Sequence, residues 1–447
     1  MSKKKEVTFE SLVNEFIEKT TRMCEKKQEA METLPFYPWD LSGPPFTSPV
    51  PFDADTIRRY AASIGDDNPL YTDPDYGNKS VYGSQIAPGP MLALVRYPSA
   101  HGASNMRPEG YPIANFISGT AWEFFDVIRV GDRFKSSQKH AEFVDKKGSK
   151  GRLLFIISDN SYWRLHGDLV SKSYGTQIMI PQETMGTSRT MDLDKLGTQM
   201  LYDRGPEKLS PDAIDKIVSI IEGNVRRGPV PLYWEDVNVG DEIPPIILPP
   251  WTLQDQIVYH NIGYGAVGGP YAWENGYRRA RYEGGAHARR THPVTLWPWT
   301  QAAEHEDALL AGFRNLSLPF DFGVQRLQIP QKLLSDWMGD YGFIRRMYCA
   351  LRKVNFYADY TIFKGDVVKK YIDKQKGNNK PGGVPGKKDY AAIGIRFAGV
   401  NQNGETQTPG TATVYLPSRE LGMVELPIPH PSKPRYVPFD THRREWY

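Results

Sequence analysis

Two short segments in the first half of the sequence carry groups that could transfer protons. One segment contains a carboxylate at Asp66, an amide at Asn68 and a phenol at Tyr71, and the other ends in Ala-Pro-Gly at Gly89. A carboxylate can accept a proton from a water within hydrogen-bond reach. A phenol with an ordinary pKa of about 10 donates a hydrogen bond but is a poor base at neutral pH. A glycine N–H can approach an oxygen that develops negative charge.

Composition narrows the classes of protein to which this chain can belong. Its 447 residues predict at least two domains. The net charge of +3 is too small and too dispersed for a nucleic-acid binder. Two cysteines exclude a disulfide scaffold and fit a reducing cytoplasm, where we expect the protein. No run of about eighteen apolar residues predicts a membrane span.

Residue patterns predict an α+β protein with a linker in its middle. Helices are expected over 9–34 and 54–64, with strands between 111 and 180. A helix at 211–224, capped by Ser210, belongs to the expected linker. The second half is expected to have its longest helix at 294–313 and strands over 322–416.

The two halves share residues at equal offsets, which indicates an internal duplication. In the first half these residues are Pro69, Tyr71, Asp73 and Tyr76. In the second half they are Pro270, Ala272, Glu274 and Tyr277.

The segment from Ile64 to Asp73, Ile-Gly-Asp-Asp-Asn-Pro-Leu-Tyr-Thr-Asp, resembles the hydratase motif of the MaoC-like family, G-D-x-N-P-L-H. The segment from Tyr82 to Gly89 is similar to the oxyanion-hole turn of that family. The first half is closest to its fatty-acid-synthase-like dehydratase domain, and 404–417 resembles its closing hairpin.

The resemblance implies two fused hotdog folds, each an antiparallel sheet around a central helix, that form a pseudo-dimer within one chain. The expected segments are an N-terminal helical extension (1–50), a first hotdog (51–182), a linker with a helix (183–230), a second hotdog (231–420) and a C-terminal tail (421–447). The implied reaction adds water to a 2-enoyl thioester or removes it from a 3-hydroxyacyl thioester. Coenzyme A is then part of the substrate, and no other cofactor or metal is expected.

The resemblance also assigns roles to the first-half residues. Asp66 matches the acid/base carboxylate, Asn68 could hold its loop in shape, and Gly89 matches the oxyanion donor. The histidine of the family is Tyr71 here, which removes one half of the usual pair. Tyr71 is therefore either a catalytic hydrogen-bond donor or a packing residue in a non-catalytic half.

The second half departs further from the motif. Val267 and Ala272 stand where the aspartate and histidine are expected, and Pro293 has no N–H to offer an oxyanion. The residues that we expect to contact the substrate there are Tyr264, Glu274, His260 and His292. Their glycine-rich surroundings could widen a pocket for a ring-bearing acyl group. We interpret Trp297 and Trp299 as core residues of the central helix.

The densest basic cluster also lies in the second half. The arginines expected to bind coenzyme A are Arg278, Arg281, Arg289 and Arg290. Guanidinium groups suit phosphate oxygens, although a solvated helix face explains the same residues.

Three hypotheses follow. The chain is a hydratase or dehydratase of a bulky, possibly ring-bearing acyl-CoA; a degenerate acyl-CoA-binding subunit that supports a partner thiolase, aldolase or hydratase; or a related lyase or hydrolase with His260 or Glu274 as base. We expect a homo- or hetero-oligomer, without nucleic acid or membrane as partner.

Overall fold

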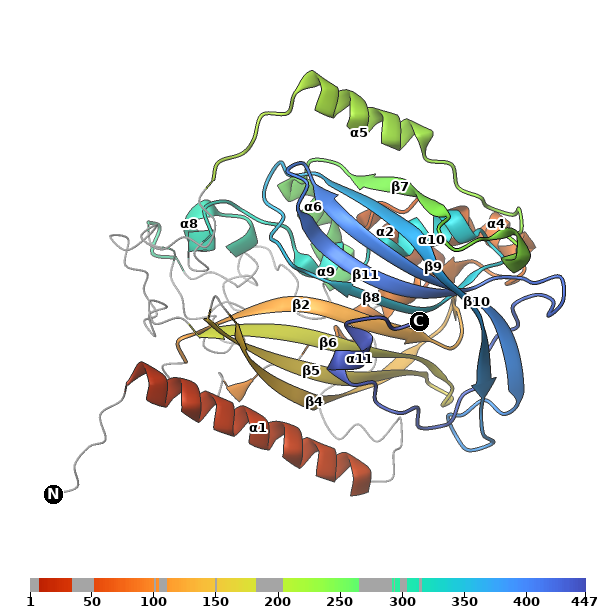
Figure 1. Ribbon diagram of the computed structural model, residues 1–447, viewed down its shortest axis with the longest axis horizontal. Coiled ribbons are helices and arrows are strands. Elements are labelled where there is room, and N and C mark those ends of the chain that lie inside the picture. Colours follow the sequence, from red (N-terminus) through yellow and green to blue (C-terminus); the bar gives the residue numbers. More distant parts are fainter. Residues whose placement is uncertain are drawn as a thin grey trace.

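A computed structural model describes residues 8–33, 52–99, 102–103, 111–148, 151–181, 204–264, 292, 294–297, 304–312 and 316–447. For residues 26–33 and 263–264 it describes the backbone alone. Over these ranges an antiparallel sheet runs through the molecule and helices pack against it (Figure 1). Among the described helices, none is both long and apolar enough to cross a bilayer.

The first half supplies four long strands and a group of short helices. The strands are β2 (Ile113–Phe124), β4 (Phe134–Gly148), β5 (Gly151–Arg164) and β6 (Leu169–Pro181), with a separate two-stranded sheet of β1 (Ile86–Ala87) and β3 (Ile128–Arg129). The helices are α1 (Phe9–Thr33), α2 (Ala54–Ser63), α3 (Pro69–Thr72), α4 (Pro74–Lys79) and the 3₁₀ helix η1 (Gly89–Leu94). The linker contains α5 (Pro211–Gly223).

The second half repeats this arrangement and adds an edge strand. Its strands are β7 (Glu242–Leu248), β8 (Phe343–Ala350), β9 (Thr361–Lys376), β10 (Lys387–Asn401) and β11 (Thr406–Tyr415). Its helices are η4 (Trp234–Asp236), α6 (Leu253–Tyr259), the π-helical turn η5 (His260–Tyr264), α8 (Ala308–Ala311), α9 (Gly323–Arg326), α10 (Pro330–Met338) and α11 (Phe439–His442).

The described strands form one nine-stranded sheet in the order β4-β5-β6-β2-β8-β11-β10-β9-β7. The order β4-β5-β6-β2 in the first half is repeated as β9-β10-β11-β8 in the second, so the duplication is present in the topology. The two sets meet where β2 pairs antiparallel with β8.

One hydrophobic core fills the space between this sheet and helices from both halves. Ile57 of α2, Leu92 of η1 and Leu334 of α10 are buried in it together with strand residues such as Trp122 and Ile393. Hydrophobic burial of this kind is the main stabilising contribution to folding. Because one core contains side chains of both halves, the helices of the second half lie next to those of the first.

Most local expectations are confirmed. Helix α2 begins after Asp53, whose side chain accepts a hydrogen bond from the Thr56 N–H at 2.8 Å. Helix α5 begins after Ser210, whose hydroxyl caps the Ala213 N–H at 3.1 Å. A side-chain acceptor at this position satisfies one of the unpaired N–H groups of the first turn.

The expected long helix at 294–313 is wrong in its described part. Residues 294–297 lie in an irregular, exposed segment, and the helical residues that the structure describes in that region are a 3₁₀ turn at 304–305 and the one-turn α8. Trp297 is 59% exposed and is not a core residue. The long helix of the second half is instead α10, where strands were expected. Its Pro330 at the first helical turn and Gly339 after the last residue are ordinary helix boundaries, and the expectation of strands over 322–416 overlooked them.

A buried ion pair ties β2 to β8. Arg345 donates to a Glu123 carboxylate oxygen at 2.7 Å and to the Phe124 carbonyl at 3.2 Å, and its guanidinium lies over the Phe125 ring at 4.6 Å from the centroid. The Arg345 side chain is only 2% exposed. A buried charge of this kind needs its partner, since little water can replace it.

We therefore expect Glu123→Gln to lower the free energy of unfolding by about 3–5 kcal/mol, because Arg345 keeps its charge and loses its counter-ion. Denaturant titration would measure the change. The matched control is Glu18→Gln, which removes one member of an exposed ion pair with Arg22 and should leave the midpoint nearly unchanged. Equal midpoint shifts in the two variants would contradict the role of the buried pair.

Candidate active site

The segment after α2 turns Asp66 into the protein. Gly65 has a φ of +70°, which glycine adopts without strain, and the Asp66 N–H then donates to the Ala61 carbonyl at 2.9 Å. The Asp66 carboxylate accepts a hydrogen bond from the Asn68 N–H at 3.0 Å, and the Asn68 side chain accepts one from the Leu70 N–H at 3.0 Å. Asn68 therefore caps α3.

The environment of Asp66 brings its pKa close to neutrality. Its carboxyl is 1% exposed, and burial raises its pKa to about 6, with Lys332 lowering it and Asp336 raising it further. Among the described residues, no hydrogen-bond partner is found for its second oxygen. A carboxyl with a pKa near the working pH can both accept and return a proton, which is what general acid–base catalysis requires.

Tyr71 meets a residue from the other half of the chain. Its hydroxyl accepts a hydrogen bond from the Gln331 side-chain amide of α10 at 3.0 Å. Burial raises the Tyr71 pKa well above its ordinary value, so the phenol stays protonated. With its oxygen held by Gln331, the hydroxyl proton can be donated to a third group.

Gly89 is the first residue of η1, so its N–H has no partner within that helix. A β-carbon at this position would lie 2.6 Å from the Phe124 ring. Packing against Phe124 therefore disfavours any larger residue at this position.

A cavity of about 50 Å³ brings several of these groups together. Asn68, Tyr71 and Gly89 line it from the first half, and Gln331 and Ser335 line it from α10. This volume is large enough for one or a few water molecules. Asp66 is not among the lining residues but lies next to them, two residues before Asn68 in the same turn.

Two candidate residues of the second half, His260 and His292, do not line the cavity beside Tyr71. His260 is buried beside Phe322, with ring centroids 4.7 Å apart, and burial lowers its pKa to about 4, with His305 lowering it further. His292 accepts hydrogen bonds at Nδ1 from the Val294 and Thr295 N–H groups at 3.1 and 3.0 Å, so it holds a turn.

The remaining candidates cannot be placed. Tyr264 ends the π-helical turn η5, and only its backbone is described. Glu274, Arg278, Arg281, Arg289 and Arg290 lie outside the described residues. In the described part of the chain, no group of three or more His, Cys, Asp or Glu side chains could hold a metal ion.

A charged cluster next to Asp66 was not expected from the sequence. Arg226 of the linker pairs with Asp67 and, at 2.8 Å, with Asp336 of α10. Lys332 of α10 pairs with the same two carboxylates at 3.1 and 2.9 Å. The spacing of Lys332 and Asp336 by four residues is a helical signal, but no sequence pattern connects them to Asp67, about 265 residues away.

The Asp66 pKa predicts how stability depends on pH. A carboxyl whose pKa is about 6 when folded and about 4 when unfolded stabilises the fold below pH 4, and this contribution is lost as the pH rises to 6. We expect Asp66→Asn to be more stable than the wild type by up to about 3 kcal/mol above pH 7, with no difference below about pH 4. Urea unfolding at several pH values would measure this. Asp75→Asn, at an exposed carboxylate, is the control, and a pH-independent Asp66→Asn effect would contradict the raised pKa.

Comparisons with known proteins show similarity in the first half of the sequence and in the fold. Residues 47–173 match the family model described as FAS1-like, dehydratase domain region. A UPF0336 protein of Streptomyces avermitilis is 29% identical over 90 residues, which are 20% of this chain and 60% of that relative, so the match spans less than two thirds of its length.

Among solved structures, a MaoC-like dehydratase has a TM-score of 0.51 at 15% identity and covers 83% of this chain and 96% of its own. A Mycobacterium tuberculosis protein described as a double hotdog fold has a TM-score of 0.44 at 10% identity, covering 85% of this chain and 98% of its own. Residues 47–173 therefore resemble a FAS1-like dehydratase domain region, and the chain shares its fold with a MaoC-like hotdog protein.

Proposed function

We propose that the protein adds water to a 2-enoyl thioester, or removes it from a 3-hydroxyacyl thioester, with Asp66 as the acid/base group. One observation carries the proposal: a buried carboxyl with a pKa of about 6 lies next to a water-sized cavity lined by Tyr71 and Gly89. The family model over residues 47–173 supports the same reaction class.

The groups divide the reaction between them. In hydration, the Asp66 carboxylate accepts a proton from water while the water oxygen bonds to the β-carbon of the enoyl group. The electron pair of the double bond moves toward the thioester oxygen, where the Gly89 N–H stabilises the negative charge. The α-carbon then takes the proton back from Asp66, and the double bond is lost. Tyr71 orients the water through its hydroxyl.

The proposal extends to the substrate and to the architecture. We propose a bulky acyl group linked to coenzyme A, with Arg278, Arg281, Arg289 and Arg290 near its phosphates. We also propose that 51–182 and 231–420 are two hotdog repeats that form a pseudo-dimer. The repeated strand order and the pairing of β2 with β8 support this division.

Asp66→Asn tests the acid/base role. We expect hydration of crotonyl-CoA to fall by about 10²–10⁴-fold, because the amide cannot accept the proton of water. Binding of a saturated acyl-CoA should stay unchanged, since the side chain keeps its size. In the wild type, hydration should rise with pH as Asp66 ionises near pH 6. Absorbance of the enoyl thioester measures the rate, with Asp75→Asn as control.

Substitutions of Tyr71 distinguish an enzyme from an acyl-CoA-binding subunit. Tyr71→Phe should cost less than Asp66→Asn, because it removes a hydrogen bond and no charge, whereas Tyr71→His restores the family pair and should speed hydration. A protein that binds acyl-CoA but never adds water, even as Tyr71→His, would be an acyl-CoA-binding subunit for a partner enzyme.

The proposed coenzyme A site has its own test. Arg289→Ala combined with Arg290→Ala should weaken acyl-CoA binding, and the loss should shrink as salt rises because screening weakens the wild-type attraction as well. Calorimetric titration at two salt concentrations would measure it. Unchanged affinity at low salt would assign both arginines to a solvated surface.

A further inference from the structure

A second, larger cavity lies on the other side of the Asp66 turn. Its volume is about 580 Å³, within the range of about 300–1,000 Å³ typical of small-molecule sites. Ile64, Gly65 and Asp67 line it from the turn, and Ile329, just before α10, and Lys332 of α10 line it from the second half. The water-sized cavity beside Tyr71 is too small for an acyl chain, whereas this one can hold a large hydrocarbon group.

Apolar side chains from β7, α6, α5 and the segment before α6 form part of the walls of this cavity. Ile246 lies in β7, Trp251 precedes α6, Val258 lies in α6 and Ile221 lies in α5. Trp251 is buried, whereas Val258 and Ile221 are 42% and 50% exposed and lie at the rim. Exposed apolar residues around an apolar cavity favour the entry of an apolar ligand.

The charges in the cavity compensate one another. Arg326 pairs with Asp321 at 2.8 Å, with both side chains buried. Arg226 and Lys332 are shared between Asp67 and Asp336, as described above. Each of the described cations in the lining lies next to a carboxylate, so the cavity offers an anionic ligand no unpaired cation and favours an uncharged group.

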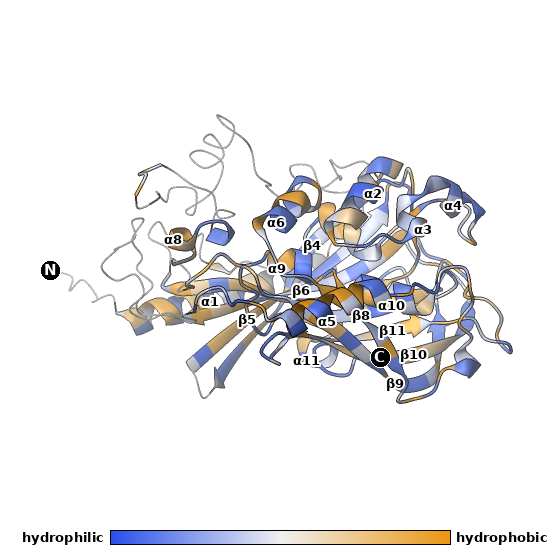
Figure 2. Ribbon diagram, turned by 90° about the horizontal axis from the view of Figure 1, so that it is seen from above, coloured by the Kyte–Doolittle hydropathy of each residue, from blue (hydrophilic) through white to orange (hydrophobic). Residues whose placement is uncertain are grey.

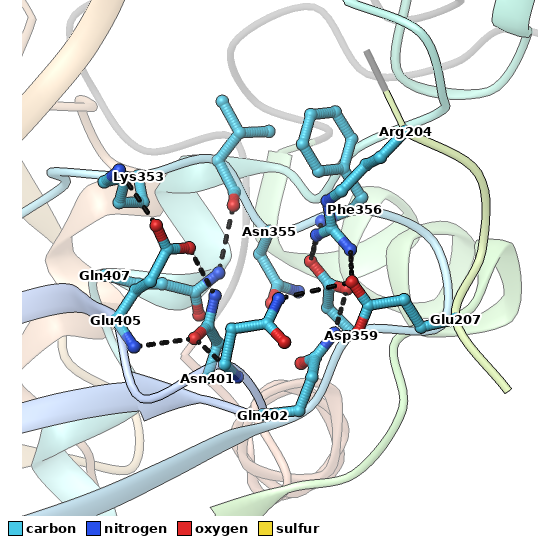
Figure 3. A network of polar contacts seen from close by, with 12 residues as sticks. Arg204, Glu207, Lys353, Asn355, Phe356, Asp359, Asn401, Gln402, Glu405 and Gln407 are labelled. Carbon is cyan, nitrogen blue, oxygen red and sulfur yellow. Dashed lines mark hydrogen bonds and ion pairs between the residues drawn. The ribbon is translucent and has the colours of Figure 1, made fainter. Parts of the chain in front are cut away.

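Helix α5 forms one wall of the cavity, and the linker segments before and after it hold it in place. Before α5, Arg204 pairs with the buried Asp359 and lies over the Phe356 ring, 4.9 Å from the centroid (Figure 3). After α5, Asn224 donates to Asp336 at 3.1 Å and Arg226 continues the attachment. The linker therefore holds α5 in place over β7 (Figure 1).

Helix α5 itself contributes few buried side chains. Ile217 is its one buried residue, and Ile214, Val218 and Ile221 stay exposed along the helix. Hydrophobic residues recur along α5, as Figure 2 shows. A helix held at its ends, yet loosely packed along its length, leaves the space beneath it available.

We propose that this cavity binds the uncharged hydrocarbon part of the acyl group, with the linker helix α5 as one wall. The inference rests on the proposed function in taking that group to be part of a thioester. The reacting carbons would then lie at the Asp66 turn. The attacking water would lie in the small cavity beside Tyr71, and the hydrocarbon part of the acyl group would lie in the larger cavity. Residues outside the dehydratase-region match, in α5, β7 and α6, would select the acyl group.

The fluorescence of Trp251 reports whether the cavity is occupied. We expect an acyl-CoA with a bromine at the end of a medium-length chain to quench the protein fluorescence more than its unbrominated analogue, because bromine in contact with the indole quenches it. The extra quenching should be lost in Trp251→Phe, while binding of the unbrominated analogue remains. Equal bromine quenching in the wild type and in Trp251→Phe would overturn the proposal.

Two neighbouring residues of α6 give a matched pair of variants. Val258→Phe fills the cavity from its rim and should weaken binding of the medium-chain acyl-CoA by about 10-fold or more, with acetyl-CoA unaffected. Ile257 is 52% exposed and does not line the cavity, so Ile257→Phe should change neither affinity. Equal effects of the two substitutions on the affinity for the medium-chain acyl-CoA would also overturn the proposal.

The outcome is separable from that of the proposed reaction. Crotonyl-CoA is too short to need this cavity, so its hydration tests Asp66 alone. Quenching at Trp251 without hydration would support the acyl site and refute the enzyme. Hydration of crotonyl-CoA without quenching at Trp251 would support the enzyme and refute the acyl site.

Discussion

The pairing of β2 with β8 is the constraint on which the site depends. Neither half of the chain contains all the groups around Tyr71: Asn68 and Gly89 come from the first half, and Gln331 and Ser335 from the second. These residues meet because the two sets of strands form one sheet, which places α10 against α3 and η1. The buried pair of Glu123 and Arg345 lies at this joint.

The buried ion pair contributes specificity as well as stability. Arg345 also contacts the Phe124 carbonyl and the Phe125 ring, so these contacts form together only when β8 lies at one height along β2. A strand shifted by one residue would turn every side chain to the opposite face of the sheet. The register of β2 and β8 thus sets which residues of α10 face the Asp66 turn.

Local features of the fold could be predicted from the sequence, because their causes are local. Asp53 and Ser210 start helices through their own side chains, and the Gly65-to-Asn68 turn carries its glycine, its carboxylate and its cap within four residues. The position of α10 could not be predicted in this way. Pro330 and Gly339 are local boundary signals for this helix, but nothing local indicates which of its faces packs against the first half. The charged cluster at Asp67 depends on the same packing.

Fusion of the two halves into one chain explains why the two polar faces of α10 differ. Gln331 and Ser335 are four residues apart and lie on the face of α10 toward Tyr71, whereas Lys332 and Asp336 lie one position further round, toward Asp67. In two identical subunits, each change on such a helix would alter both sites. In a fused chain the second-half helix can serve the first-half site alone, so Gln331 can bind Tyr71 and Lys332 can oppose the rise in the Asp66 pKa that burial causes. The second half therefore shapes the surroundings of Tyr71 and Asp66 through the helix it packs there.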